Sequence, residues 1–88
     1  MDLKLGDIVR LRVPYGTPKR SFRFGIVAEM LSALPDGSIE EVSLYLYEPT
    51  TKEILLGPNH IPEYVDFHTS EFELYKRASD DGYVSLVS

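Results

Sequence analysis

Apolar and polar residues alternate along most of this chain, and this pattern restricts the possible folds more than any other feature. Between Val42 and Leu46 every second residue is aliphatic, and similar alternation recurs over residues 8–13, 22–30 and 71–75. Alternation with a period of two places apolar side chains on one face of a β-strand and polar ones on the other. The same segments are rich in β-branched and aromatic residues, which favour strands. No long segment has a helical apolar repeat, so the sequence predicts an all-β fold.

Turn-forming residues separate these runs. Leu34–Ser38 contains Pro, Asp and Gly in an order that favours a tight reversal, and Glu48–Glu53 is a second polar reversal. A short strand is predicted at Ile54–Leu56, followed by an irregular loop that contains two prolines over residues 57–64. A single helical turn is expected near Ile61–Phe67 or near His68–Phe72. The residues predicted to point inward are Val9, Leu11, Val13, Phe22, Phe24, Ile26, Ala28, Met30, Val42, Leu44, Leu46, Phe72 and Leu74.

The length of 88 residues suits one domain, residues 1–88, with a limited core. Cysteine is absent, which excludes disulfides, thiolate metal sites and cysteine nucleophiles. A sheet that closes on itself has no exposed edges, so we predict a small SH3-like barrel of five or six short antiparallel strands. Residues 76–88 are predicted to form a terminal hairpin or a loosely held tail. No signal peptide and no apolar run of ~20 residues is found, so we expect a cytoplasmic protein that does not contact membranes.

Positive charge gathers near the N-terminus of an otherwise acidic chain. The net charge is −5, yet residues 1–28 hold six of the nine Lys and Arg residues. Residues 13–21, the predicted loop between the first two strands, contain two prolines, which fix φ and shape the loop. Arg and Tyr are frequent anchors of protein interfaces. The alternative is that these cations are solvated strand residues that pair with the surplus acids. The predicted partner-binding residues are Arg10, Arg12, Tyr15, Lys19, Arg20 and Arg23.

Three tyrosines form a second candidate surface. Tyr45 and Tyr47 lie on the polar face of the strand predicted at residues 41–47, and Tyr64 lies in the loop that follows. Exposed aromatic rings on one face can stack on bases or hold proline-rich segments. Their commoner role is packing across the sheet as a second apolar layer, and we favour that interpretation.

Residues 60–71 contain both histidines and several acids, yet the spacing matches no metal-ligand motif. No phosphate-binding glycine loop, nucleophile elbow or Ser/His/Asp arrangement is found. We therefore predict no catalytic residue, no metal and no other cofactor. The potential metal ligands in this segment are His60, Glu63, Asp66, His68 and Glu71.

The segments GDIVRLRV (Gly6–Val13) and FGIV (Phe24–Val27) resemble the first two strands of many small SH3-like barrels. KOW-type and Tudor-like modules begin in this way. So do accessory proteins of bacterial redox systems: the variable chain of ferredoxin–thioredoxin reductase, a ferredoxin-docking subunit of the photosynthetic NAD(P)H dehydrogenase complex and a nitrogenase maturation factor. Their layout continues with segments similar to Ser43–Glu48 and His68–Tyr75, so the resemblance covers residues 5–75. It implies the barrel fold and an accessory role.

Residues 6–30 also resemble the opening of the MazF/PemK family of toxin endoribonucleases, in which a basic loop follows a Gly-Asp-Ile-Val strand. That resemblance implies a catalytic arginine at Arg20 or Arg23. The sequence departs from the family at Phe24, which stands where the family has proline.

The leading functional prediction is a non-enzymatic protein–protein interaction module that docks on an acidic partner surface through the basic Tyr/Pro loop. The alternative is an RNA-binding protein or a MazF-like endoribonuclease that uses the same loop, although the acidity of the whole chain disfavours nucleic acid. A third possibility is a structural subunit whose tyrosine face is buried in a homo-oligomer.

Overall fold

Strands make up most of the computed structural model, which describes residues 2–78. The prediction of an all-β domain is therefore confirmed. The predicted C-terminal hairpin or tail lies almost entirely outside the described residues. Six strands and two single-turn 3₁₀ helices occur in the order β1 (Ile8–Thr17), β2 (Arg20–Ala33), β3 (Ile39–Glu48), β4 (Glu53–Ile54), η1 (Pro58–His60), β5 (Tyr64–His68), η2 (Thr69–Glu71) and β6 (Phe72–Lys76).

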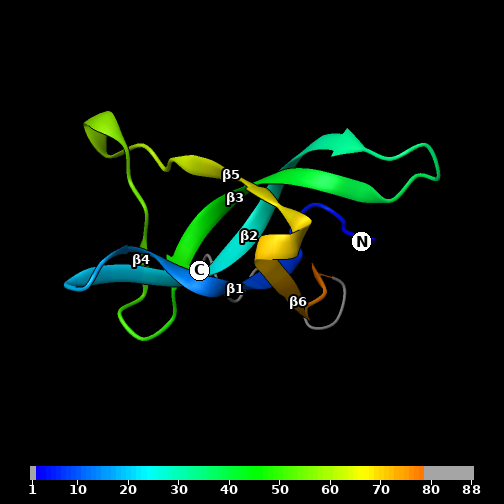
Figure 1. The fold of residues 1–88 in the computed structure, drawn as a ribbon. Coiled ribbons are helices and arrows are strands. Elements are labelled where there is room, and N and C mark those ends of the chain that lie inside the picture. The colour runs from blue at the N-terminus through cyan, green and yellow to red at the C-terminus, as the bar shows by residue number, and fades with distance from the viewer. Residues whose placement is uncertain (1, 79–88) are drawn as a thin grey trace.

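The six strands form one antiparallel sheet in the order β4-β3-β2-β1-β6, and β5 pairs with β3 beside β4. The chain passes from β5 through η2 directly into β6, so the single turn of η2 connects the two edges of the sheet (Figure 1). Within residues 2–78 no ladder of hydrogen bonds joins β5 to β6. The sheet thus has the predicted number of strands, but it is a curled open sheet and not a closed barrel.

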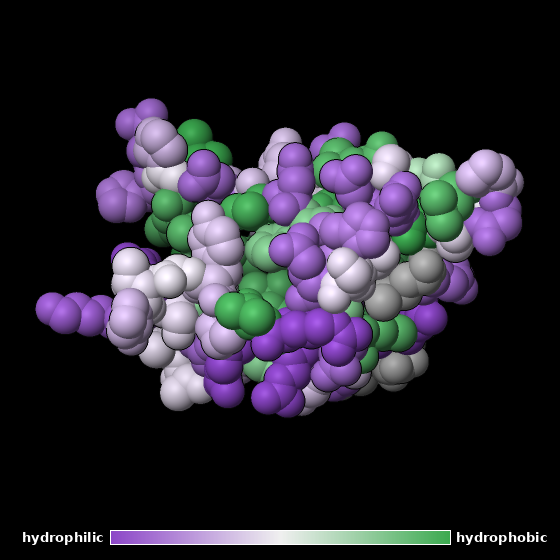
Figure 2. Space-filling view, in the orientation of Figure 1, coloured by the Kyte–Doolittle hydropathy of each residue, from purple (hydrophilic) through white to green (hydrophobic). Residues whose placement is uncertain are grey.

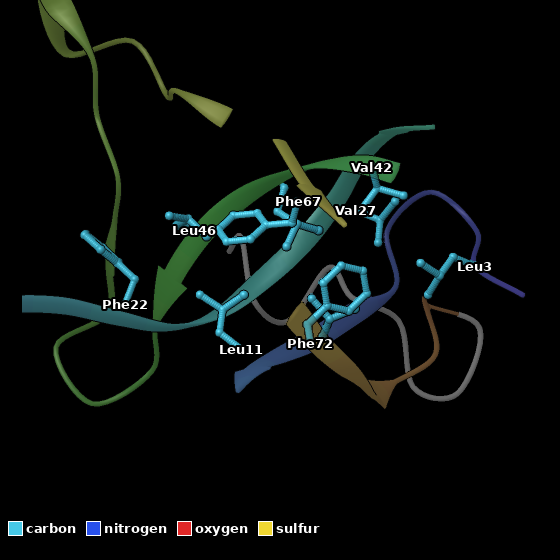
Figure 3. Packing of buried hydrophobic residues seen from close by; sticks show 10 residues of the cluster. Leu3, Leu11, Phe22, Val27, Val42, Leu46, Phe67 and Phe72 are labelled. Atoms are coloured by element: carbon cyan, nitrogen blue, oxygen red, sulfur yellow. The ribbon is translucent and has the colours of Figure 1, made fainter. Parts of the chain in front are cut away.

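The inner face of this sheet carries the core. Val42, Leu44 and Leu46 of β3 are completely buried, as their alternation predicts. The rings of Phe67 and Phe72, from the two edges of the sheet, both reach into this core (Figure 3). The cluster of buried residues consists of Leu3, Val9, Leu11, Phe22, Val27, Val42, Leu44, Leu46, Phe67 and Phe72.

Two predictions about burial need correction. Val13 is 76% exposed, because β6 covers β1 only as far as Leu11 and the register of β1 shifts before Tyr15. Phe24 and Ile26 are buried but lie outside the inner cluster. Their partners on the neighbouring strands lie on the face of the sheet opposite the core. β2 therefore buries apolar side chains on both of its faces.

The predicted loop is confirmed over residues 57–63, but the sequence did not predict β5, which begins at Tyr64. Val65 and Phe67 of this strand pair with Leu44 and Val42 of β3 and contribute to the core. The second 3₁₀ helix, η2, falls within the range expected for a helical turn. The remaining segment, residues 55–63, folds back on itself through a bridge between Leu56 and Pro62 and extends away from the sheet (Figure 1).

Asp7 links the two ends of the described chain through hydrogen bonds to its carboxylate. Its carboxylate is 1% exposed and accepts hydrogen bonds from the backbone N–H groups of Lys4 and Ala78, both at 3.0 Å. Arg77 donates to the same carboxylate at 3.1 Å. The carbonyl of Asp7 also accepts from the N–H of Val27 on β2. The aspartate of the Gly-Asp-x-Val opening is therefore a buried structural acceptor.

Candidate functional site

The predicted basic loop is a β-hairpin in the structure. β1 continues to Thr17 and β2 starts at Arg20, so the connection is a tight turn at Pro18 and Lys19. Gly16 adopts a φ of +118°, and a Cβ atom there would lie 2.4 Å from the carbonyl oxygen of Arg20, so this position requires glycine. The hairpin presents its side chains on a rigid ladder rather than on a flexible loop.

Tyr15 anchors this hairpin to the body of the protein. Its ring meets that of Phe67 edge-on, with the centroids 6.1 Å apart, and the side chain is only partly exposed. A ring held in this way has little conformational freedom left to lose when a partner binds.

Two of the predicted cations have acidic partners at the surface. Arg20 lies 2.9 Å from the carboxylate of Glu53, and Arg12 lies 3.9 Å from that of Glu73. Arg12 also donates from Nε to the carbonyl of Ser70. Both arginine side chains are more than half exposed, and such surface pairs contribute little to stability. The pairs reduce the positive charge of the hairpin without fixing Arg12 or Arg20 firmly.

Arg23 is held much more strongly. Its Nε and Nη2 atoms donate to the two carboxylate oxygens of Glu48 at 2.9 and 2.7 Å, and Nη2 also donates to Thr50. Glu48 is almost completely buried, and its carboxylate accepts a further bond from the Thr50 N–H. Burial raises the pKa of Glu48, but the hydrogen bonds from Arg23 outweigh this effect and lower the pKa to about 2. The charge of Arg23 is therefore balanced within the fold.

This pair predicts a change of stability with pH. The pKa of Glu48 is 4.5 in the absence of the fold and about 2 within it, so its contribution is complete above pH 4.5 and is lost as the pH falls towards 2. Because Arg23 is half-exposed, we expect Glu48→Gln to cost only about 1–2 kcal/mol at pH 7, and less at pH 3. Urea unfolding at both pH values measures this difference. An equal loss at pH 7 and pH 3 would contradict the assignment, and Glu63→Gln, at an exposed carboxylate, is the control.

Three of the predicted residues meet in one shallow hollow. Arg10, Arg12 and Arg23 line a depression of about 440 Å³ that also contains Pro14 and a single carboxylate, Glu73. We call this depression the arginine hollow. Arg10 and Arg23 both lie over the ring of Phe24, with the guanidinium carbons 5.9 and 5.7 Å from its centroid. Among residues 2–78 no carboxylate forms an ion pair with Arg10.

The other predicted residues lie elsewhere on the hairpin. Lys19 and Arg20 border a polar hollow beside Glu48 and Glu53, to which Arg23 also contributes. Tyr15 and Arg20 border another hollow, between the hairpin and residues 55–60. The six predicted residues therefore do not form one site. The polar hollow combines three of them with two carboxylates, and the arginine hollow combines three of them with one carboxylate.

The three predicted tyrosines lie together on the outer face of the sheet, the face opposite the core. The rings of Tyr45 and Tyr64 meet edge-on with centroids 5.5 Å apart. The strand registers place one row of side chains in the order Ile8, Ile26, Tyr45 and Tyr64, and the next row in the order Arg10, Phe24, Tyr47 and Ile54.

An apolar groove on this face was not predicted from the sequence. It has a volume of about 520 Å³, and no charged side chain lines it. Leu5 and Ile61 at its rim are 61% and 62% exposed. The sequence gives one clue, since Ile61 and Pro62 are apolar residues within a segment expected to be a loop. The groove is lined by Leu5, Gly6, Ile26, Val27, Tyr45, Ile54, Ile61 and Pro62.

Apolar side chains also show at the centre of the face seen in Figure 2, between hydrophilic ones. The exposed large apolar residues of the described chain are Leu5, Val13, Tyr15, Leu31, Leu34, Leu56, Ile61, Tyr64 and Tyr75.

The histidine-rich segment has a structural role. His68 precedes η2, and its Nδ1 accepts a hydrogen bond from the N–H of Ser70 while Glu71 accepts one from the His68 N–H. Within residues 2–78 no group of three or more His, Asp or Glu side chains is placed to hold a metal ion. The same part of the chain has no helix long and apolar enough to cross a membrane.

Comparisons with protein families, with curated proteins and with solved structures found no match for this chain. The chemistry of its surface therefore has to indicate its function.

Proposed function

We propose that this protein is a non-enzymatic docking module that binds an acidic segment of a protein partner at the arginine hollow. The observation that carries the proposal is the presence of three guanidinium groups and one carboxylate in the same depression of a protein whose net charge is −5. Guanidinium groups bind carboxylates through paired hydrogen bonds, and a local field of this sign favours acidic partners.

Arg10 is the central residue of this proposal. It forms no ion pair with another described residue, and the ring of Phe24 supports its guanidinium group, so a partner carboxylate need not displace any acid of residues 2–78. Arg23 and Arg12 are already engaged with Glu48 and with Ser70 and Glu73, so Arg10 is the cation of the hollow whose charge these acids leave unbalanced. The resemblance to accessory subunits of redox complexes agrees with a docking role.

The test is binding of fluorescent peptides measured by anisotropy at low salt. We expect a glutamate-rich peptide to bind, and a matched glutamine-rich peptide not to bind. Arg10→Glu should weaken binding about tenfold, and the effect should shrink as salt screens the charges. Lys52→Glu, which makes the same change of charge in the turn between β3 and β4, is the control.

Binding of the glutamate-rich peptide that is unaffected by Arg10→Glu would contradict the proposal. Tighter binding of a single-stranded RNA than of the peptide would favour the alternative function, RNA recognition by the same arginines.

A further inference from the structure

The apolar groove and the arginine hollow belong to one continuous surface. Arg10 and Ile8 are alternate residues of β1 and share its outer face, and Ile8 pairs across the sheet with Ile26, which lines the groove. Phe24, the partner of Arg10 in the register, pairs in turn with Tyr47. No charged residue occurs in either row between Arg10 and the groove.

The spacing of these two features follows from strand geometry. The two rows are two residues apart along each strand, which is about 7 Å, and neighbouring strands are about 4.8 Å apart. Arg10 on β1 therefore lies about 10 Å from the centre of the groove, which is near Ile26 on β2 and Tyr45 on β3. An extended peptide covers this distance with about three residues.

The groove itself favours an apolar occupant. Its lining contains no charged side chain, and the exposure of Leu5 and Ile61 leaves aliphatic surface in contact with water. Burying such surface stabilises a complex, whereas a charged side chain placed there would lose its hydration without gaining a partner.

We propose that the groove binds a bulky apolar side chain of the same partner segment whose carboxylates occupy the arginine hollow. This inference rests on the proposed function and defines the partner more closely. The ligand is an extended protein segment that carries acidic residues about three positions away from a large aliphatic or aromatic residue. Acidic residues alone would engage one part of the surface, and the apolar residue sets the position and direction of the segment.

A second copy of this chain fits the surface less well. Two-fold pairing of outer faces places the same patch on both sides of the interface. Arg10 and its neighbours would then face either the uncharged groove of the other copy or its arginine hollow, where three arginines outnumber a single carboxylate, Glu73, that is already paired with Arg12. The complementary partner for this surface carries negative charge and apolar groups together.

The test compares three fluorescent peptides of about twelve residues by anisotropy with the full chain. The first has a pair of glutamates three residues before a pair of leucines, the second has serines in place of the leucines, and the third has glutamines in place of the glutamates. Ile61→Ser changes the rim of the groove at an exposed side chain. Leu34→Ser, at an exposed leucine in the turn between β2 and β3, is the matched control.

We expect the first peptide to bind at least tenfold more tightly than the second or the third. Ile61→Ser should weaken binding of the first peptide about tenfold and leave binding of the second unchanged. Leu34→Ser should change neither. Moving the leucines about eight residues from the glutamates should abolish the advantage of the first peptide over the second, because the groove is then out of reach.

The outcomes separate this inference from the proposed function. If Arg10→Glu weakens binding of the first two peptides equally and Ile61→Ser has no effect, the inference is wrong and the docking proposal stands. If neither acidic peptide binds at low salt, both are wrong. A dimer that forms with increasing protein concentration and that Ile61→Ser disrupts, without peptide binding, would identify a second copy as the occupant and overturn the inference.

Discussion

Replacing Asp7 by alanine is expected to remove about a third or more of the folding free energy of this protein. The buried carboxylate accepts hydrogen bonds from the N–H groups of Lys4 and Ala78 and from the guanidinium group of Arg77. Alanine would leave these donors without their acceptor at a position where the wild-type side chain is 1% exposed. Leaving a buried hydrogen-bond donor without its acceptor costs about 1–3 kcal/mol, and two backbone N–H groups and one guanidinium group lose their acceptor here, whereas small domains have about 5–10 kcal/mol in total.

The effect should spread beyond the immediate hydrogen bonds. Asp7 lies just before β1, and its carboxylate holds Ala78, two residues after the end of β6. Its backbone carbonyl also accepts a hydrogen bond from the N–H of Val27 on β2. Loss of the side chain therefore loosens the edge of the sheet where β6 pairs with β1. We expect the backbone N–H groups of β6 to lose their protection from hydrogen exchange before those of β3.

Urea unfolding followed by circular dichroism measures the loss of stability. Asp7→Asn keeps one acceptor oxygen and the shape of the side chain, so its loss should be smaller than that of alanine. Glu63→Gln, at an exposed carboxylate, should change stability by less than about 0.5 kcal/mol. A loss below about 1 kcal/mol for Asp7→Ala would show that the carboxylate does not hold the ends of the chain together.

The fold class was predictable because the strongest pattern in the sequence depends only on neighbouring residues. Alternation over β3 correctly predicts that Val42, Leu44 and Leu46 are buried, and the same reasoning holds for Val9 and Leu11 of β1. These residues point inward whichever strands they pair with. Whether the sheet closes into a barrel was not predictable in this way, since closure requires hydrogen bonds between its two edge strands, which are distant in the sequence.

The errors in predicting strands and burial arise where nearby residues favour different structures, or where the strand register determines whether a side chain is covered. Prolines favour a loop before Tyr64, yet Val65 and Phe67 alternate with polar residues and form β5 against β3. Val13 continues the alternation of β1, but no strand covers it beyond the end of β6. Prolines act on the backbone close to them, whereas the burial of a strand residue depends on which other strands pack against it in the tertiary structure.

The candidate site shows the same division. The sequence identifies the residue types of the arginine hollow, but it cannot show that Arg23 is paired with Glu48, which lies 25 residues away in the chain. It also cannot show that Leu5 and Ile61 border the same groove, because this depends on where the tertiary structure places the N-terminal segment and residues 55–63 on the outer face. Pairing of β2 with β3 and of β3 with β5 places all three predicted tyrosines on one face.

Phe72→Ala is the second substitution for which we expect a large effect. Phe72 is completely buried at the start of β6, and it pairs with Leu11 of β1. It enters the core from one edge of the sheet, and Phe67 enters from the other (Figure 3). No hydrogen-bond ladder joins β5 to β6 within residues 2–78, so the curled shape depends on these side chains and on η2.

Truncation of a buried phenylalanine to alanine costs about 3–5 kcal/mol, because apolar contacts are lost and a cavity remains. Phe72→Leu keeps most of the volume and should cost about 1–2 kcal/mol, so the pair of variants distinguishes packing from a specific need for an aromatic ring. Urea unfolding gives both values.

If Phe72→Ala costs no more than Phe72→Leu, the two edges of the sheet are held by backbone contacts instead. If it costs about 3 kcal/mol or more, the core itself keeps the open sheet curled, and the outer face with Arg10 and the groove keeps its shape only while that core is intact.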